Sequence, residues 1–382
     1  MALALEGRVL RGRRLEPGEV SVAAGRIAMR GRPRGARRVL PDGWVVAPGL
    51  VDLQVNGYAG AEVGDDPDAL AAVAAALPAA GVTAFCPTLI SRPEAAYRRA
   101  AAALARVRWP SAGARPLGVH LEGPFLAPSR TGAHPVDALR EPSPERLERA
   151  LRDFAPAIVT LAPELPGGLD AIGRIAAAGA VAAIGHTEAD SAQGRAAIAA
   201  GARLATHALN AMRGVERRDP SALVAFVADP RARISLIGDG VHVAPEVAGV
   251  LARATGARLV LVSDAISAAG MPPGRYRLGG LEVESDGLMA VRGGRLAGAV
   301  AGLDRGPRTL VVAGVARAAA LAAATAAPRR LLGLPTGLAP GEPADLVVLD
   351  ADLVPRLTLV DGIVAHADPA LPFDVPERGA AA

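Results

Sequence analysis

The sequence predicts an α/β fold: a (β/α)8 TIM barrel that carries a small β-sandwich domain built from both termini. Eight short β-branched runs end in polar residues, and each is followed by an alanine-rich segment with helical periodicity. This alternation is typical of parallel βα units, and eight is the number of strands that closes a barrel. Short strands joined by turns also occur outside the repeat, at both ends of the chain, and these predict the second domain.

The eight predicted barrel strands follow one another along the chain. In order they are VVAPGLVDLQVNG, VTAFCPTL, LGVHLEG, AIVTLAPE, VAAIGHT, LATHALNAM, RISLIGDG and LVLVSDA. The segments between them carry helix signals. DDPDALAAVAAALPAAG has Pro67 early and closes on Gly81, and SRPEAAYRRAAAALARV opens on Ser91 with Pro93 in its first turn. PSPERLERALRDF and DPSALVAFVAD begin in the same way.

The pattern changes after the eighth strand. RYRLGGLEVESDGLMAVRGGRLAG alternates at period two around SDG, which predicts a β-hairpin inserted near 274–298, before a last helix RTLVVAGVARAAALAAAT. The predicted domains are therefore 1–47 and 329–382 for the two parts of the small β domain, and 48–328 for the barrel. Only the final residues, ERGAAA, are expected to be disordered.

Composition excludes several classes of protein. The chain of 382 residues is 51% hydrophobic, but no window has the eighteen or so uninterrupted apolar residues of a membrane span. Its net charge of +4 is small, and its arginines are interleaved with Ala, Gly and Glu rather than clustered in a stripe. We expect a cytoplasmic protein that binds neither nucleic acid nor membrane. Cys86 is the only cysteine and is interpreted as a small buried hydrophobic residue, so any metal must be held by His, Asp or Glu.

Four polar residues fall at or near predicted strand ends, where the loops of a barrel converge on one mouth. Glu122 ends the third strand, His186 ends the fifth, His207 lies in the sixth and Asp264 ends the eighth. Two histidines and a carboxylate with an open position form a common catalytic zinc set. Such a metal lowers the pKa of its bound water, and Asp264, which is not needed as a ligand, can then move the proton.

Other candidates have competing interpretations. A lone histidine at a strand end is often structural, and His120, one alternation before Glu122, is interpreted as an orienting partner or as barrel filling. Glu164 and Asp239 are expected to be supporting residues. The segment NAMRGVERRDP follows His207 and carries three arginines that can pair with phosphate oxygens, although arginine runs are usually solvated surface: Arg213, Arg217 and Arg218.

Together the motifs resemble the amidohydrolase superfamily and, within it, the N-acetylglucosamine-6-phosphate deacetylases. The motifs PGLVDLQVNGYAG, CPTLI, HLEGPFLAPSRTGAH, GHTEA, THALNAMRG, GDGVHV and SDAISAAGMPPGRYRLGG occur in the order of the family and cover nearly the whole chain. The resemblance implies a barrel of the metal-dependent hydrolase type. It also implies hydrolysis of the N-acetyl group of N-acetylglucosamine 6-phosphate, giving glucosamine 6-phosphate and acetate, in amino-sugar catabolism and cell-wall recycling.

The resemblance also implies roles for individual residues. Glu122, His186 and His207 would bind one divalent metal ion per subunit, with zinc expected and iron, cobalt or manganese as alternatives. Asp264 would be the catalytic base and acid, and His134 would polarise the acetyl carbonyl or hold the sugar. The sugar phosphate would be bound by the set Asn210, Ala211, Arg218 and His242. Because the arginine in this family can reach across an interface, a homodimer with Arg218 near the partner's site is implied.

Two departures from the family pattern leave alternatives open. Many amidohydrolases place His-x-His at the end of the first strand to hold a second metal, whereas this chain has Gln54 and Asn56, so one metal is expected. Relatives have hydroxyl residues where this chain has Ala299–Gly302, a change that can loosen substrate contacts or loop packing. The alternatives are a deacetylase of another substrate, such as N-acetylgalactosamine 6-phosphate or an N-acyl amino acid, or a non-catalytic sugar-phosphate-binding relative.

Overall fold

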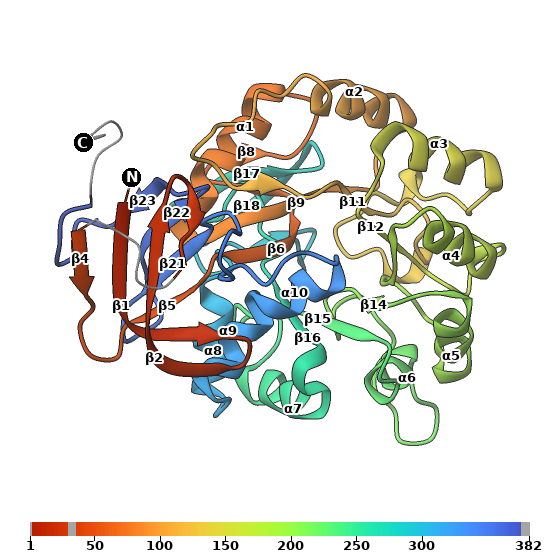
Figure 1. Cartoon of the computed structure of the whole chain (residues 1–382). Coiled ribbons are helices and arrows are strands. Elements are labelled where there is room, and N and C mark those ends of the chain that lie inside the picture. Colours follow the sequence, from red (N-terminus) through yellow and green to blue (C-terminus); the bar gives the residue numbers. More distant parts are fainter. Residues whose placement is uncertain (1, 30–35, 376–382) are drawn as a thin grey trace.

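A ring of parallel strands forms the centre of the larger part of the molecule (Figure 1). The computed structural model describes residues 2–29 and 36–375. The strands of the ring are β6 (Leu50–Val55), β9 (Val82–Ile90), β11 (His120–Glu122), β12 (Ile158–Leu161), β13 (Val181–Ile184), β14 (Leu204–Ala205), β15 (Arg233–Ile237) and β16 (Leu259–Val262). Neighbours pair in that order, and a bridge between Val55 and Ala265 brings the chain after β16 back beside β6. The predicted eight-stranded barrel is confirmed, with the short strand β10 (Arg115–Pro116) as an addition to β9.

Helices cover the outside of the ring (Figure 1). They are α1 (Pro67–Ala76), α2 (Glu94–Leu104), α3 (Pro144–Phe154), α4 (Gly168–Ala177), α5 (Ser191–Ala200), α6 (Ala222–Ala228), α7 (Pro245–Thr255), α8 (Arg305–Val312), α9 (Arg317–Ala324) and α10 (Ala326–Leu331), with short 3-10 turns η1 (Leu77–Ala80), η2 (Pro128–Arg130), η3 (Val136–Ala138) and η4 (Gly256–Arg258). Asp66 caps α1 and Ser143 caps α3, because each side chain accepts a hydrogen bond from a backbone N–H of the first turn.

Two predicted helices differ from the structure. The segment predicted to open on Ser91 becomes helical only at Glu94, because Pro93 supplies the cap residue and Ser91 stays buried at the end of the preceding strand. The single last helix expected over RTLVVAGVARAAALAAAT is two helices, α8 and α9. The chain turns between them at Gly314, whose φ of 80° is incompatible with a continuous right-handed helix.

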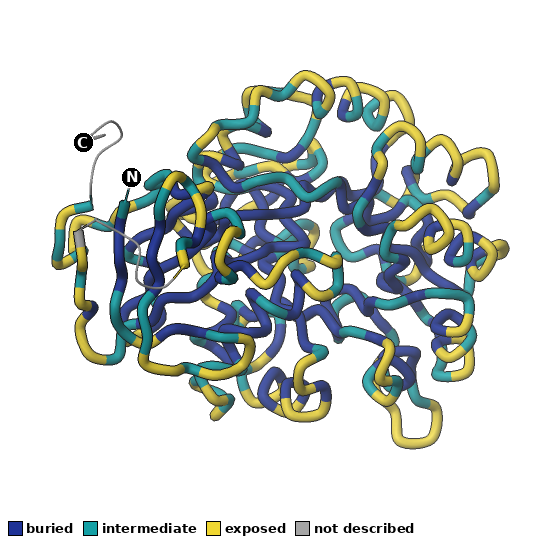
Figure 2. Tube along the Cα trace, in the orientation of Figure 1, coloured by how far each residue is buried: buried dark blue, intermediate teal, exposed yellow. Residues whose placement is uncertain are grey.

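The barrel strands are buried on both faces, as Figure 2 shows for the central part of the molecule. All nine residues of β9 and all six residues of β6 are buried. Parallel strands covered by helices bury both faces, which explains why the sequence shows continuous apolar runs rather than alternation. Inside the ring, Val51, Leu53, Ala84, Cys86 and Val260 belong to one packed cluster. This interior supports strand ends that carry the polar residues.

The two ends of the chain build a second sheet, which is mixed but mostly antiparallel (Figure 1, left). Its strands are β1 (Ala2–Arg11), β2 (Arg14–Ala23), β3 (Arg26–Ile27), β4 (Ala36–Val39), β5 (Val45–Pro48), β21 (Leu346–Leu349), β22 (Pro355–Val360) and β23 (Ile363–Ala367). The N-terminal and C-terminal strands meet where β5 pairs with β21. The sheet also curls back on itself, because the Ile27 N–H donates to the Glu342 carbonyl at 2.9 Å and encloses a core that includes Leu3, Val46 and Leu359.

The run VVAPGLVDLQVNG serves both sheets. It was predicted as one barrel strand, but β5 belongs to the terminal sheet and only β6 belongs to the barrel. Gly49 separates them, and a Cβ at this position would lie 2.1 Å from the Thr83 hydroxyl, so only glycine fits where the chain crosses. The predicted boundary between 47 and 48 falls within β5, and the division into domains stays a prediction.

The insertion after the barrel is a four-stranded meander rather than the single predicted hairpin. It consists of β17 (Gly274–Leu278), β18 (Leu281–Ser285), β19 (Ala290–Arg292) and β20 (Arg295–Leu296), each pairing with the next. Besides the predicted turn at SDG, pairs of glycines at 279–280 and 293–294 have positive φ and make two further turns. A small hairpin of β7 (Gly57–Tyr58) and β8 (Ala61–Glu62) follows β6.

No helix among the described residues is both long and apolar enough to cross a membrane. The expectation for ERGAAA lies outside the described residues.

Candidate metal centre and active site

A cavity of about 480 Å³ lies at the carboxyl ends of the barrel strands. It is lined by eight of the nine residues named from the sequence as site candidates: Glu122, His134, His186, His207, Asn210, Ala211, His242 and Asp264. Strand ends of a barrel converge on this face, so residues up to 142 positions apart in the chain meet. The meander contributes Leu278, Arg295 and Leu296 to the same wall.

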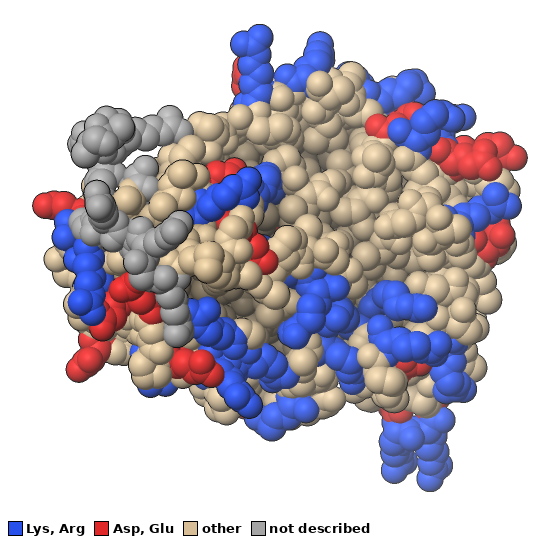
Figure 3. Space-filling model, viewed as in Figure 1, with Lys and Arg blue, Asp and Glu red and all other residues tan. Residues whose placement is uncertain are grey.

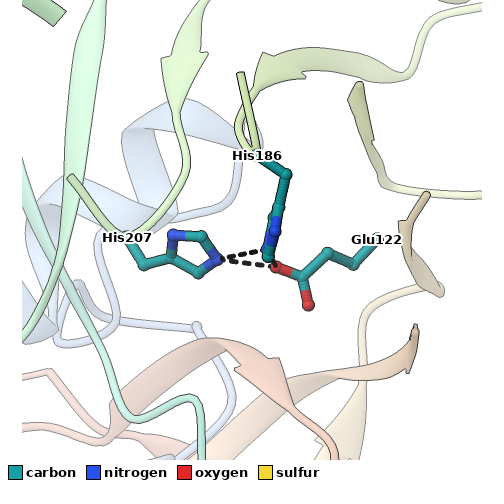
Figure 4. A group of neighbouring side chains, drawn as sticks. All are labelled: Glu122, His186 and His207. Atoms are coloured by element: carbon teal, nitrogen blue, oxygen red, sulfur yellow. Dashed lines mark hydrogen bonds and ion pairs between the residues drawn. The ribbon is translucent and has the colours of Figure 1, made fainter. Parts of the chain in front are cut away.

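Glu122, His186 and His207 converge on one point inside this cavity (Figure 4). Glu122 Oε1 lies 2.7 Å from His207 Nε2 and 3.1 Å from His186 Nε2, and the two imidazole nitrogens are 3.1 Å apart. All three side chains are buried. Among the residues that the structure describes, these three are the group of His, Cys, Asp and Glu side chains whose geometry could hold a metal ion.

The protonation of this cluster suits a cation. His186 Nδ1 lies 2.7 Å from the Arg130 carbonyl, which can only accept, so Nδ1 carries the proton and Nε2 presents a lone pair. Burial and the neighbouring His134 lower the pKa of His186 to about 4. Burial lowers the pKa of His207 too, but the hydrogen bond and charge of Glu122 outweigh it and raise that pKa. The His207 proton therefore lies among lone pairs from three side chains, and a divalent ion is the natural replacement for it.

Glu122 remains ionised in this setting. Burial raises the pKa of its carboxyl group, but contacts with the neighbouring imidazoles of His134, His186 and His207 bring it well below its usual value. Gln54, the first departure from the His-x-His pattern, donates through Nε2 to Glu122 Oε1 at 3.1 Å. An amide in this place orients the carboxylate without adding a strong metal ligand, so the donor set fits one metal ion and not two.

Asp264 lines the same cavity, after β16, and Asn56 Nδ2 donates to its Oδ1 at 2.8 Å. Burial and repulsion from Glu122 raise the pKa of Asp264 to about 7. A carboxyl group with a pKa near neutrality can accept and return a proton under working conditions. Asn56, the second departure from the His-x-His pattern, thus holds this carboxyl group.

Left-handed backbone recurs at the site. His186, His207 and Asp264 have φ of 51°, 32° and 52°, values that non-glycine residues rarely adopt. Non-glycine residues in this region cluster at functional sites, because the surroundings must compensate a cost of ~1–3 kcal/mol each. This conformation also corrects one prediction: β14 ends at Ala205, so His207 lies two residues beyond the strand and not within it.

His134 comes from the long loop after β11 and reaches back over the cluster. Its Nδ1 accepts a hydrogen bond from the Ser91 backbone N–H at 3.2 Å, and the Ser91 hydroxyl lies 2.9 Å from the same nitrogen. The proton of a neutral His134 must therefore sit on Nε2, which is 3.7 Å from Glu122 Oε2. This geometry directs an N–H donor into the cavity. Ser91 was not recognised as a site residue from the sequence, where it stood in the position of a helix cap.

The remaining candidates divide into two groups. His242 Nδ1 lies 2.7 Å from Asp239 Oδ2, which leaves Nε2 for a ligand, and Asn210 and Ala211 line the same wall. Arg218 does not line this chain's cavity. It is exposed on the loop between β14 and α6, which projects at the lower right of Figure 1, where Figure 3 shows basic side chains. Arg130 and Arg295, which line the cavity, were missed because single arginines carry no motif.

Two other residues, His120 and Cys86, are buried in surroundings that indicate a structural role. The ring nitrogens of His120 lie 2.9 Å from the Leu53 carbonyl and 2.7 Å from the Thr160 hydroxyl, and burial lowers its pKa to about 4. Both nitrogens are thus engaged away from the metal cluster. Cys86 is fully buried in β9, and burial raises the pKa of its thiol, so it is no nucleophile.

The altered segment Ala299–Gly302 is hydrogen-bonded to the chain around Asp264. The Ala299 N–H donates to the Asp264 carbonyl at 2.9 Å, and the Ile266 N–H donates to the Ala299 carbonyl at 3.1 Å. A Cβ on Gly302 would lie 2.8 Å from Ala80 Cβ, so this position has no room for a larger residue. The segment supports Asp264 through its backbone.

Comparisons with known proteins show the family of the chain. Residues 45–370 match the model of the amidohydrolase family. The chain belongs to the amidohydrolase family. Among characterised members, human N-acetylglucosamine-6-phosphate deacetylase is 36% identical over 379 residues, which are 94% of this chain and 91% of the human protein. N-acetylgalactosamine-6-phosphate deacetylase of Escherichia coli O157:H7 is also 36% identical, over 85% of this chain and 88% of that protein.

A solved amidohydrolase structure extends the likeness to three dimensions. It is a point variant of N-acetyl-D-glucosamine-6-phosphate deacetylase from Mycobacterium smegmatis in complex with N-acetyl-D-glucosamine-6-phosphate. It has a TM-score of 0.88 to this chain, with 37% sequence identity, and covers 96% of this chain and 99% of its own. The barrel and the terminal sheet are therefore both shared with this amidohydrolase.

Proposed function

We propose that this chain hydrolyses the N-acetyl group of N-acetylglucosamine 6-phosphate to glucosamine 6-phosphate and acetate. The observation that carries the proposal is the placement of Asp264 in the same cavity as the cluster of Glu122, His186 and His207. This arrangement lies in a chain that is 36% and 37% identical, over most of its length, to deacetylases named for that substrate. The enzyme is thus a hydrolase that breaks a linear amide bond.

In this proposal one divalent metal ion, with zinc expected, is held by Glu122, His186 and His207. When bound, such an ion lowers the pKa of a water ligand and polarises an amide carbonyl. The Gln54 side chain keeps the Glu122 carboxylate in its ligating orientation, and the Arg130 carbonyl does the same for the His186 ring.

Asp264 and His134 supply the proton chemistry. Asp264 takes one proton from the attacking water while the water oxygen bonds to the acetyl carbon. The carbonyl oxygen becomes an oxyanion, and His134 donates a hydrogen bond to it from Nε2–H. The C–N bond then breaks, and Asp264 returns the proton to the leaving amine. The second proton of the water remains with acetic acid. Asn56 holds Asp264 at 2.8 Å through one oxygen and leaves the other free for this transfer.

The phosphate of the substrate is proposed to lie near His242, Asn210 and Ala211. Asp239 orients His242 by accepting from Nδ1, and Nε2 would donate to a phosphate oxygen when the ring is an imidazolium. Arg218 is exposed and outside this cavity, so we propose a cytoplasmic homodimer in which Arg218 of the partner subunit completes the phosphate site. Guanidinium pairs well with phosphate oxygens, which is the physical reason for assigning it this role.

A second candidate substrate is N-acetylgalactosamine 6-phosphate, because the Escherichia coli O157:H7 relative named for it is as similar in sequence, at 36%, as the human protein. The two sugars differ in the configuration of one hydroxyl group. The same catalytic groups would serve either sugar.

An acetate-release assay tests the proposal on both phosphorylated sugars and on unphosphorylated N-acetylglucosamine, with metal content measured on the same sample. We expect the highest kcat/KM with N-acetylglucosamine 6-phosphate. Equal rates on phosphorylated and unphosphorylated sugar would refute the phosphate site. A higher kcat/KM with N-acetylgalactosamine 6-phosphate would make that sugar the substrate instead. Absence of acetate release from metal-loaded protein, with sugar phosphate still bound, would make the chain a non-catalytic relative.

A further inference from the structure

A second cavity lies on the outer side of the barrel, between β9, the loop after β11, and helices α2 and α3. Its volume is about 90 Å³. It shares no lining residue with the metal cavity. A cavity of this size holds several water molecules, and therefore also a small anion.

The lining of this cavity is strongly basic. Five arginines and two carboxylates line it, together with aromatic side chains from α2, α3 and the loop after β11: Arg92, Arg98, Arg140, Arg146, Arg149, Glu94, Asp153, Tyr97, Phe154 and Phe125. Glu94 already pairs with Arg98 at 3.3 Å and also with Arg149. Asp153 pairs with Arg152. The carboxylates therefore leave most of the positive charge of the lining unpaired.

Arg92 is the central observation. Its side chain lines the cavity although the residue is only 7% exposed, and its Nε donates to the Ile90 carbonyl at 3.3 Å. Among the described residues no carboxylate lies within ion-pair distance of it, although Glu62 and Asp65 attract it from farther away. Its guanidinium carbon lies 6.0 Å from the Tyr97 ring centroid. A buried arginine without a paired carboxylate is costly to fold unless an anion completes it.

Arg140 and Arg146 approach the same space from the other side. Arg140 Nη1 donates to the carbonyls of Asp137 and Leu139, and Arg146 Nη1 donates to the Glu141 carbonyl at 3.5 Å. Neither forms an ion pair with a carboxylate in the part of the chain that the structure describes. These backbone contacts hold both guanidinium groups at the rim with donors to spare, since each guanidinium carries five N–H donors.

We infer that this cavity is a binding site for a small oxyanion, a phosphate or carboxylate group, clamped between buried Arg92 and the rim residues Arg140 and Arg146. Planar guanidinium groups match the oxygens of either group with paired hydrogen bonds. The site is separate from the substrate phosphate site and does not depend on the proposed reaction. Two of its lining residues adjoin residues of the metal centre in sequence, because Arg92 follows Ser91 and Gly123 follows Glu122.

Hydrogen exchange measured by mass spectrometry locates the anion. The full-length protein is incubated with inorganic phosphate or with succinate, and sodium chloride at matched ionic strength serves as the reference. We expect saturable slowing of exchange in peptides covering 90–98 and 138–150 with one or both oxyanions. Protection by both anions would show that the site accepts phosphate and carboxylate groups alike. Protection by only one of them would show which of the two groups the site binds.

Variants give the decisive comparison. In the double variant Arg140→Ala/Arg146→Ala, the anion concentration that gives half-maximal protection should rise by about tenfold or more, because charge-assisted hydrogen bonds are lost. Arg92→Met should abolish it, and since the buried change can disturb folding, the exposed double variant carries the test by itself. The matched control Arg99→Ala removes an arginine of α2 that pairs with Asp65 and does not line the cavity; it should bind like the native protein. Protection confined to the metal cavity, or equal protection by chloride, would overturn the inference.

Discussion

Ser91 and His134 are 43 positions apart in the chain, yet the Ser91 backbone N–H donates to His134 Nδ1 at 3.2 Å. The amide fixes the tautomer, because a nitrogen that accepts a hydrogen bond cannot also carry the proton of a neutral ring. The hydroxyl of Ser91 makes a second contact at 2.9 Å. Substitution of the Ser91 side chain removes only the hydroxyl contact. The contributions of the backbone amide and the hydroxyl to the orientation of His134 can therefore be separated.

We predict that His134→Ala lowers kcat by about 10²–10³, the usual cost of removing one donor to an oxyanion. Ser91→Ala should lower kcat by less than about tenfold, since the backbone N–H still fixes the ring and a neutral hydrogen bond contributes only ~0.5–1.5 kcal/mol. Steady-state acetate release measures both. Equal losses in the two variants would show that the hydroxyl, and not the amide, determines the orientation of His134.

Replacement of Glu122 by glutamine should remove the metal. The amide is a poor ligand for zinc, and it leaves two imidazoles without the charge that balances a divalent ion. Metal content by mass spectrometry should fall from about one ion per chain to well below that, as expected for a set of three protein ligands. The control is Glu164→Gln at the neighbouring strand end, where the carboxylate accepts from the Glu188 N–H and the Thr187 hydroxyl. Full metal occupancy in Glu122→Gln would contradict the ligand assignment.

The isosteric change Asp264→Asn should leave the metal in place and abolish most of the activity. Asp264 is not a member of the ligand cluster, and loss of a general acid and base typically costs about 10²–10⁴ in rate. Metal content and acetate release measured on one sample distinguish the roles. If Asp264→Asn lost its metal in parallel with its activity, the carboxylate would be a ligand rather than a proton carrier.

Metal binding should release protons in a pH-dependent way. In the metal-free cavity burial and Glu122 raise the pKa of Asp264 to about 7, and Glu122 raises that of His207. A bound cation repels both protons, so fewer protons are held after binding. The release from Asp264 should decline as the pH rises through 7, because Asp264 is then already ionised before the metal binds. Calorimetric titration of metal in buffers of different ionisation enthalpy measures this number; a release that rose with pH would rule out Asp264 as the source.

Subunit mixing tests Arg218. Arg218→Ala should raise KM for the phosphorylated sugar with little change in kcat, whereas exposed Arg217→Ala serves as the control on the same loop. If Arg218 acts across an interface, mixing Arg218→Ala with inactive Asp264→Asn should restore sites that combine Asp264 of one subunit with Arg218 of the other. A monomer by sedimentation, or absence of any recovery after exchange of subunits, would reject the shared site.

Much of the barrel and its site was predictable because both depend on short local patterns. Buried parallel strands show as β-branched runs, and a polar residue that interrupts such a run marks a strand end. The insertion was only partly predicted, since its extra turns at paired glycines resemble flexible loop sequence. Ser91 could not be found in this way, because its contact with His134 joins distant segments. The burial of Arg92 could not be predicted for the same reason. Its neighbours in the cavity include residues of α3, which are distant in the sequence.

The pairing of β5 with β21 has a consequence for synthesis on the ribosome. Residues 45–48 leave the ribosome nearly three hundred residues before residues 346–349, their partner strand. The hairpin of β1 and β2 can form early, but the terminal sheet must wait with an open edge until the barrel between its halves has been translated. Open edges of this kind invite wrong pairing. Chaperone engagement of nascent chains should therefore persist through the barrel and end only when the last strands emerge.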